Sequence, residues 1–140
     1  MIDGSFEKCL ILEKIISIFY DNKKIRILNS LVYKENVNRL IDNYFDIENE
    51  EIDFLSIDVD GIDYYLFAEL NFRPKLICIE YNHWLGSNQS VVIPYDPNFK
   101  WKRDFYSGAS LLAITRLASK KKVSLSSSRY ISHKRFFYKR

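Results

Sequence analysis

Two short apolar runs, the second of them rich in β-branched residues, constrain the fold of this 140-residue chain more than any other feature. Phe54–Asp58 and Leu76–Glu80 both have the composition of strands, and the second is apolar at successive positions, as expected where both faces of a parallel strand are covered. Residues 63–70 predict a helix between them, which ends before Arg73-Pro74 because proline disfavours helix in the preceding residue. A strand, a helix and a second strand in this order predict a parallel pair of central strands in an α/β sheet, with Ile57, Ile77 and Ile79 buried on both sides.

The same alternation continues along the rest of the chain. Further strands are predicted at residues 1–3, 25–28, 123–127 and 135–139, and further helices at residues 6–20, 34–44 and 107–120. The buried face of the helix at 34–44 is expected to carry Val37, Leu40, Ile41 and Tyr44. The last two strands are expected to form an antiparallel hairpin. No repeat or linker composition interrupts the pattern. Residues 1–140 are therefore expected to form one α/β domain: a mostly parallel sheet with helices on both faces and an antiparallel C-terminal strand pair.

Composition narrows the class of protein. The chain is 47% hydrophobic and 28% charged, which suits one globular domain with its own core. Its longest apolar stretch, Cys9–Tyr20, is too short to span a bilayer, and its N-terminus lacks the basic segment of a signal peptide. Cys9 and Cys78 both lie in apolar runs, so we expect reduced core thiols in a cytoplasmic protein rather than a disulfide.

Charge is divided unevenly along the sequence. Residues 1–100 hold 10 Lys and Arg against 17 Asp and Glu, whereas residues 101–140 hold 11 against the single acid Asp104. Clustered cations beside aromatic side chains can bind phosphates and stack bases, so a nucleic-acid-binding module in residues 101–140 is one interpretation. The simpler interpretation, which we adopt, is a solvated basic edge on a domain whose other edge is acidic.

Polar side chains follow each predicted strand of the parallel part of the sheet. They are Asp3, Asn29, Ser30, Asp58, Asp60, Glu80, Tyr81 and Asn82. Such residues also cap helices, but capping requires only one or two of them. Because ligands of open parallel sheets bind beyond the carboxyl ends of the strands, these side chains predict one shared binding cleft.

The segment Asp58-Val59-Asp60-Gly61 permits three chemistries. A D-x-D pair can hold a divalent cation in nucleotide-sugar transferases, although two residues alone do not predict a metal site. D-x-D-G also resembles the opening of the haloacid-dehalogenase phosphatases, in which the first Asp is the nucleophile and the second a general acid. Those enzymes usually have Thr after the glycine, where this chain has Ile62. The third chemistry, methyl transfer, fits more of the chain.

A family resemblance supports the third chemistry. Residues 52–67, I-D-F-L-S-I-D-V-D-G-I-D-Y-Y-L-F, resemble the fourth strand and following turn of the FkbM-like methyltransferases, which are class I S-adenosylmethionine enzymes with a D-[VI]-[DE]-G box at this point. Other segments are similar to the ends of the second and third strands, to the fifth strand, and to later loop and helix motifs: residues 2–8, 27–30, 73–82, 94–101 and 106–111. The terminal strand pair resembles the sixth and seventh strands. The resemblance implies a Rossmann-like fold.

The resemblance also implies which residues bind the cofactor, S-adenosylmethionine. Asp3 would bind the ribose hydroxyls, and Asn29 or Ser30 would lie near the adenine. Asp58 and Asp60 would line the cleft beside the methyl donor as catalytic residues. A buried carboxyl group at Asp58 with a raised pKa could then act as general base on an acceptor hydroxyl.

The acceptor side of the cleft would be formed by the strand end at Glu80. Glu80, Tyr81 and Asn82 would face the acceptor, which the resemblance implies is a hydroxyl of a glycan or small metabolite. His83 is either a proton acceptor near that site or a solvated loop histidine. Five aromatic side chains could form a lid on a sugar ring or could simply pack over the end of the sheet: Trp84, Tyr95, Trp101, Phe105 and Tyr106.

The chain departs from the family at its N-terminal end. In the family, a first strand and a glycine-rich loop that cradles the methionine part of the cofactor precede the second strand. This chain has four glycines, at positions 4, 61, 86 and 108, so no G-x-G-x-x-G turn or P-loop lies within it. We therefore expect a methyltransferase-like domain that is N-terminally incomplete, either as a fragment or as a form without catalysis.

Overall fold

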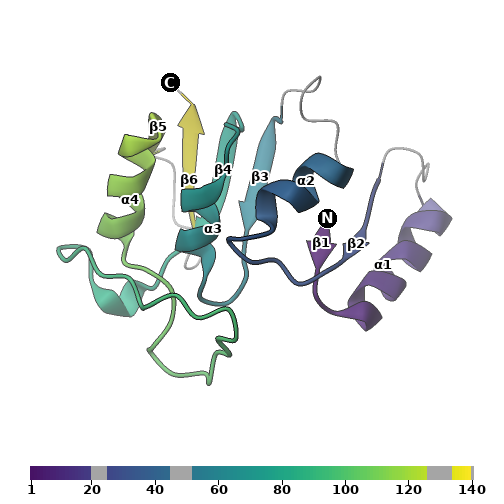
Figure 1. Ribbon diagram of the computed structural model, residues 1–140, viewed down its shortest axis with the longest axis horizontal. Coiled ribbons are helices and arrows are strands. Elements are labelled where there is room, and N and C mark those ends of the chain that lie inside the picture. Colours follow the sequence, from purple (N-terminus) through teal and green to yellow (C-terminus); the bar gives the residue numbers. More distant parts are fainter. Residues whose placement is uncertain (20–24, 45–51, 126–133, 140) are drawn as a thin grey trace.

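The computed structural model describes residues 1–19, 25–44, 52–125 and 134–139. Along them, helices and strands alternate (Figure 1). The helices are α1 (Phe6–Phe19), α2 (Val37–Tyr44), α3 (Asp63–Glu69) and α4 (Leu111–Lys120), with a short 3-10 helix η2 (His83–Leu85). The strands are β1 (Ile2–Asp3), β2 (Leu28–Asn29), β3 (Phe54–Ile57), β4 (Leu76–Glu80), β5 (Val123–Leu125) and β6 (Lys134–Lys139). The predicted α/β class is confirmed.

The strands form two sheets where the sequence predicted one. β1 and β2 pair in parallel over two residues each, with Ile2 opposite Leu28. The second sheet has the order β3-β4-β6-β5; β3 and β4 are parallel, and β6 runs antiparallel to both β4 and β5. Figure 1 shows β1 beside β3 and pointing the same way, yet these two strands belong to different sheets. Among the described residues, the predicted mostly parallel sheet is thus interrupted between β1 and β3.

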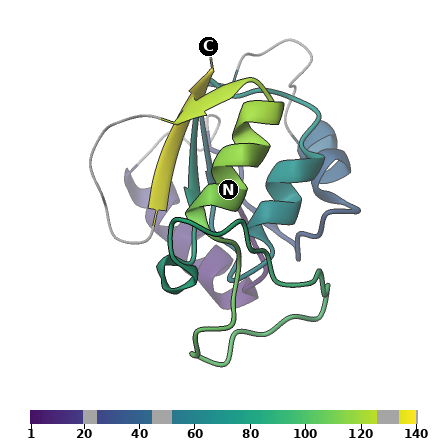
Figure 2. The ribbon, with the colours of Figure 1, turned by 90° about the vertical axis from the view of Figure 1, so that its left-hand side faces the viewer.

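The core lies between the four-stranded sheet and the helices that cover one of its faces. Figure 2 shows α2, α3 and α4 on one side of the strands and α1 toward the other. Ile57, Ile77 and Ile79 lie on neighbouring strands and are at most 6% exposed, as predicted. They pack in one cluster with Phe67 of α3 and Ile114 of α4. The apolar β3–β4 pair therefore supplies one wall of the core.

The other face of β3 and the surface of α1 are less well covered. Phe54 of β3 is 52% exposed, so β3 is not buried on both sides as the sequence predicted. The helix that the spacing of apolar residues predicted is present as α1, and Cys9 on it is buried. Five others on this helix are exposed: Phe6, Leu10, Ile11, Ile15 and Ile18. No helix within the described ranges is long and apolar enough to cross a membrane.

Side-chain hydrogen bonds explain why several elements begin later than predicted. α2 starts at Val37 rather than residue 34, because Asn36 accepts a hydrogen bond from the Tyr33 backbone N–H at 2.7 Å and holds residues 34–36 in a turn. α4 starts at Leu111 rather than residue 107, because the Ser110 hydroxyl caps it by accepting from the Ala113 N–H at 3.3 Å. β2 lies at residues 28–29 rather than 25–28. Residues 20 and 126–127 of the predicted elements lie outside the described ranges.

Two predictions about individual side chains have opposite outcomes. Both cysteines are buried, and no disulfide joins Cys9 to Cys78, as expected. Tyr44, expected on the buried face of α2, is 42% exposed because α2 ends there. Val37 and Ile41 carry the buried face instead.

Candidate functional site

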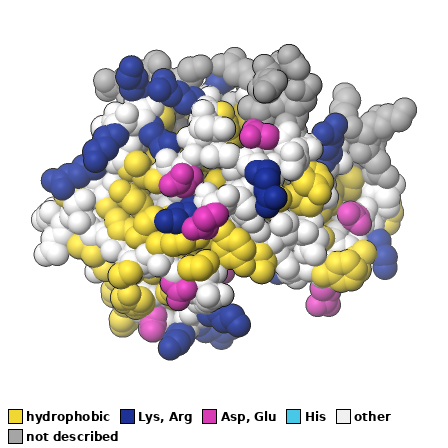
Figure 3. All heavy atoms as spheres, viewed as in Figure 1, with side chains coloured by type: hydrophobic (Ala, Val, Ile, Leu, Met, Phe, Trp, Pro, Cys, Tyr) yellow, Lys and Arg dark blue, Asp and Glu magenta, His cyan; other side chains and the backbone are white. Residues whose placement is uncertain are grey.

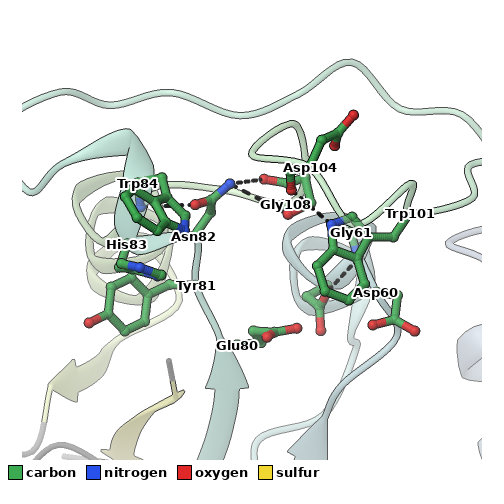
Figure 4. A pocket seen from close by; sticks show the side chains of 12 residues that line it. Asp60, Gly61, Glu80, Tyr81, Asn82, His83, Trp84, Trp101, Asp104 and Gly108 are labelled. Atoms are coloured by element: carbon green, nitrogen blue, oxygen red, sulfur yellow. Dashed lines mark hydrogen bonds between the residues drawn. The ribbon is translucent and has the colours of Figure 1, made fainter. Parts of the chain in front are cut away.

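Two adjoining cavities lie at the carboxyl ends of β1, β2, β3 and β4. We call the larger one, which has a volume of about 470 Å³, the β1–β3 cavity. The ends of β1 and β3 line it, together with the segment after β2 and residues 96–100. The smaller, of about 150 Å³, we call the β4 pocket (Figure 4). It lies at the end of β4, between the turn after β3 and the aromatic loop of residues 81–108. Asp60 lines both cavities.

The turn that carries Asp60 has a constrained backbone. Asp60 and Gly61 both have positive φ, 52° and 123°, in the region that L side chains rarely adopt. A Cβ atom on Gly61 would also overlap the ring of Phe99, so the glycine allows the aromatic loop to pack against the turn. The D-x-D-G pattern is thus required at least in part by local packing.

The buried Asp63 side chain stabilises this turn through hydrogen bonds to its backbone. Its carboxylate accepts hydrogen bonds from the backbone N–H groups of Val59 and Gly61, both at 3.1 Å, and its side chain is 3% exposed. Burial raises the pKa of the Asp63 carboxyl, the nearby charge of Asp58 raises it further, and the two N–H donors oppose the shift. The sequence analysis treated Asp63 only as the start of a helix. An Asp two residues after a D-G turn at a helix start could have suggested such backbone contacts.

Three acidic side chains converge between the two cavities. Carboxylate oxygens of Asp58, Asp63 and Glu80 all lie within 4.8 Å of one another. Asp58 lines the β1–β3 cavity and Glu80 lines the β4 pocket. The oxygens of this acidic trio match the type of ligand that a hard divalent cation takes.

Asn82 fixes the shape of the aromatic loop. Its side chain donates to the backbone oxygens of Phe105 and Ser107, each at 2.8 Å, and accepts from the Trp84 backbone N–H at 3.0 Å. Its own backbone N–H donates to the oxygen of Ala109 at 2.8 Å. Asn82 lines the β4 pocket and is 8% exposed, and its amide is already engaged in holding the loop.

Two of the five predicted lid aromatics line the β4 pocket. Trp84 and Trp101 do, and they remain 64% and 49% exposed. Figure 4 shows Trp84 beside His83 on one side of the pocket and Trp101 on the other, with Glu80 at the strand end between them. Tyr95 points elsewhere: its hydroxyl donates to the Glu35 carboxylate at 2.6 Å.

The predicted site residues divide between the two cavities. Four of the predicted cofactor and catalytic residues line the β1–β3 cavity: Asp3, Ser30, Asp58 and Asp60. Asn29 does not line it; its amide donates to the Asp3 backbone oxygen at 3.1 Å. The four predicted acceptor residues all line the β4 pocket: Glu80, Tyr81, Asn82 and His83.

The basic segment after the site is partly structural. Figure 3 shows Lys and Arg side chains at the upper left of this face, around α4. Lys120 and Lys122 are exposed, whereas the Lys121 ammonium donates to the Leu70 backbone oxygen at 2.8 Å. Burial lowers the pKa of Lys121. One of the three adjacent lysines therefore anchors the end of α4 to α3.

The chain matches no protein-family model, no curated protein and no solved structure. Its function is therefore argued from the geometry of the two cavities.

Proposed function

We propose that this chain is an S-adenosylmethionine-dependent methyltransferase-like domain whose acceptor is a hydroxyl of a glycan or small metabolite. The observation that carries the proposal is the meeting of two cavities at Asp60. Transfer of a group between two bound molecules requires that their reacting atoms lie in contact. A donor in the β1–β3 cavity and an acceptor in the β4 pocket would meet at that residue.

The strand order supports the proposal. In the FkbM-like fold that the sequence resembles, the first strand lies between the second and the fourth. Here β1 and β2 resemble the second and third strands of that fold, and β3 resembles the fourth. If that correspondence holds, the family's first strand would lie where β1 and β3 are separated here, which supports the proposal.

The residues present fit part of the cofactor. The β1–β3 cavity, at about 470 Å³, has a size suited to a small molecule. The Asp3 carboxylate at the end of β1 would accept hydrogen bonds from ribose hydroxyls, and Ser30 after β2 would lie near the adenine. The cofactor would supply an electrophilic methyl group when bound. No glycine-rich loop in this sequence could hold its methionine part, so we expect weak binding.

The acidic trio would remove the proton from the acceptor. A hydroxyl oxygen that gains a methyl group must lose its proton, and a nearby carboxylate is a suitable base. Glu80 lies on the acceptor side, and Asp58 lies on the donor side. Burial, and less strongly the nearby charge of Asp58, raises the pKa of Asp63 within this trio, so the Asp63 carboxyl takes up a proton more readily than an isolated carboxylate does.

The same trio favours one alternative, a Mg²⁺-dependent phosphatase that uses Asp58 as nucleophile. One experiment separates the two functions. The purified chain is assayed for methyl transfer from millimolar labelled S-adenosylmethionine to a panel of hydroxyl compounds, and for phosphate release from p-nitrophenyl phosphate with Mg²⁺. We expect methyl transfer that falls at least tenfold in Asp58→Asn and not in Asp53→Asn, a control at the opposite end of β3. Phosphate release that depends on Mg²⁺ and disappears in Asp58→Asn would overturn the proposal.

A further inference from the structure

We propose that the β4 pocket selects an acceptor that carries an ammonium group beside its hydroxyls, such as an amino sugar or an amino alcohol. This inference rests on the proposed function and narrows its acceptor class. It is argued from the charge of the pocket lining, from its two indole rings and from how both are held.

The lining of the β4 pocket is acidic. Four of its residues have carboxyl side chains: Asp60, Asp63, Glu80 and Asp104. Among the described residues that line it there is no Lys or Arg. Lys102 and Arg103 belong to the same loop, but they are exposed and do not line the pocket. A phosphate or carboxylate on the ligand would meet like charges here, whereas an ammonium group would be attracted.

The two indole rings add a second preference for cations. Trp84 and Trp101 are the only tryptophans in the chain, and both line this pocket. Figure 4 shows them on opposite sides of the pocket, and both remain largely exposed. Indole faces attract organic cations more strongly than other aromatic side chains do, and they also pack well against the carbon skeleton of a ligand.

Both walls are fixed before any ligand binds. The Trp101 indole N–H donates to the Asp104 backbone oxygen at 2.9 Å, and the Asp104 carboxylate accepts from the Tyr106 N–H at 3.1 Å. The Trp84 backbone is held by Asn82 at 3.0 Å, and its ring lies 4.6 Å from that of Phe105. A pre-positioned site loses less entropy when it binds, so these charges and faces act together on one small ligand.

Tryptophan fluorescence tests the inference, because both reporters lie in the pocket. The chain is titrated at pH 6.5 with glucosamine, glucose and glucose 6-phosphate. We expect glucosamine to bind about three- to tenfold more tightly than glucose, as one exposed ion pair and one cation–π contact would give. Glucose 6-phosphate should bind most weakly. Equal affinity for glucosamine and glucose, or tighter binding of the phosphate, would overturn the inference.

Two variants locate the effect. Asp104→Asn keeps an oxygen for the Tyr106 N–H and removes only the charge, so the preference for glucosamine should fall about twofold or more. Asp53→Asn, remote from the pocket, should leave it unchanged. If Asp104→Asn keeps the full preference for glucosamine, as Asp53→Asn should, the acidic lining is not the source of that preference and the inference is wrong.

The outcome is separable from that of the proposed function, because these titrations need no cofactor. A preference for glucosamine without any methyl transfer would sustain this inference and contradict the proposed function. Methyl transfer to neutral sugars in preference to amino sugars would contradict this inference and sustain the proposed function.

Discussion

The β1-α1-β2 unit and the β3-α3-β4 unit are built from the same sequence pattern, yet the second buries far more of its apolar residues, and the first buries Cys9 alone among the residues described. Ile77 and Ile79 of β4 are at most 1% exposed, whereas Ile11 and Ile18 of α1 are 53% and 72% exposed. Periodicity is sufficient to produce a helix in both units. Burial depends on a neighbouring sheet, and the two-residue strands β1 and β2 give α1 little to pack against.

The length of strand pairing differs in the same way, because β1 and β2 pair over two residues each and β3 and β4 over four. Burial of an aliphatic side chain contributes ~1.5–3 kcal/mol, so Ile57, Ile77 and Ile79 together contribute on the order of 5–9 kcal/mol. That is comparable with the whole stability of a small domain, about 5–15 kcal/mol. We therefore expect the β3-α3-β4 unit to determine the stability of the chain, and the β1-α1-β2 unit to contribute little.

The largest contrast is expected between two isoleucines. Ile79→Asp places a charge in the fully buried core and should cost about 3–5 kcal/mol or prevent folding. Ile11→Asp changes a side chain that is 53% exposed and should change the free energy of unfolding by less than about 0.5 kcal/mol. Urea denaturation measures both. Equal losses would mean that α1 is as well packed as β4.

A smaller contrast is expected between two asparagines. Asn82→Ala removes three side-chain hydrogen bonds of 2.8–3.0 Å at a buried position and should cost about 1–3 kcal/mol. Asn29→Ala removes an exposed bond to Asp3 and should cost less than about 1 kcal/mol. Thermal unfolding compares the variants. Tryptophan fluorescence should shift only in Asn82→Ala, and a shift in Asn29→Ala would show that the two units are coupled.

Asp63 should give the β3-α3-β4 unit a distinctive pH dependence. Because its pKa is raised in the folded state, the folded chain holds that proton more tightly than the unfolded chain does. This contribution to stability is complete below the unfolded pKa of about 4 and is lost as pH rises through the folded pKa. Asp63→Asn should remove this decline, as measured by denaturation from pH 4 upward. The same decline in the variant would assign it to another group.

The smallest effect is expected at a link between residues 34–36 and the aromatic loop. Tyr95→Phe removes the 2.6 Å hydrogen bond to Glu35, an exposed contact that should contribute less than about 1 kcal/mol. Burial, and then this bond, raises the pKa of Tyr95 to about 12, and the bond lowers the pKa of Glu35. In Tyr95→Phe, carboxyl NMR should show the Glu35 pKa returning upward. No change would mean that the link does not form in solution.

Local sequence signals predicted most of the helices and strands, but they did not predict which of their apolar faces are covered. Alternation and β-branched runs were enough to find β3, β4 and the helices, because these depend on the residues themselves. The exposure of Phe54 and of α1 could not be predicted, because it depends on what does or does not cover them. The helix starts at Val37 and Leu111 were not predicted, because they depend on side-chain hydrogen bonds. Asn36 accepts from the Tyr33 backbone N–H, and Ser110 accepts from the Ala113 backbone N–H.

The candidate site was predictable to a similar degree. Polar residues after each strand predicted the edge at which the two cavities lie, since the carboxyl ends of parallel strands meet there. The role of Asp63 and the turning of Tyr95 toward Glu35 depend on loop conformation, which a single sequence does not specify. The sharing of Asp60 between two cavities is likewise a tertiary property.

The most direct test of the account is a titration of the chain with S-adenosylmethionine, followed by amide NMR. We predict saturable binding in the millimolar range, with the largest shifts at Asp3, Ser30 and Asp60, and loss of binding in Asp3→Ala. Micromolar affinity would contradict the expectation that the cofactor binds weakly because this sequence has no glycine-rich loop to hold its methionine part. Shifts confined to α4 would contradict the assignment of the β1–β3 cavity to the cofactor.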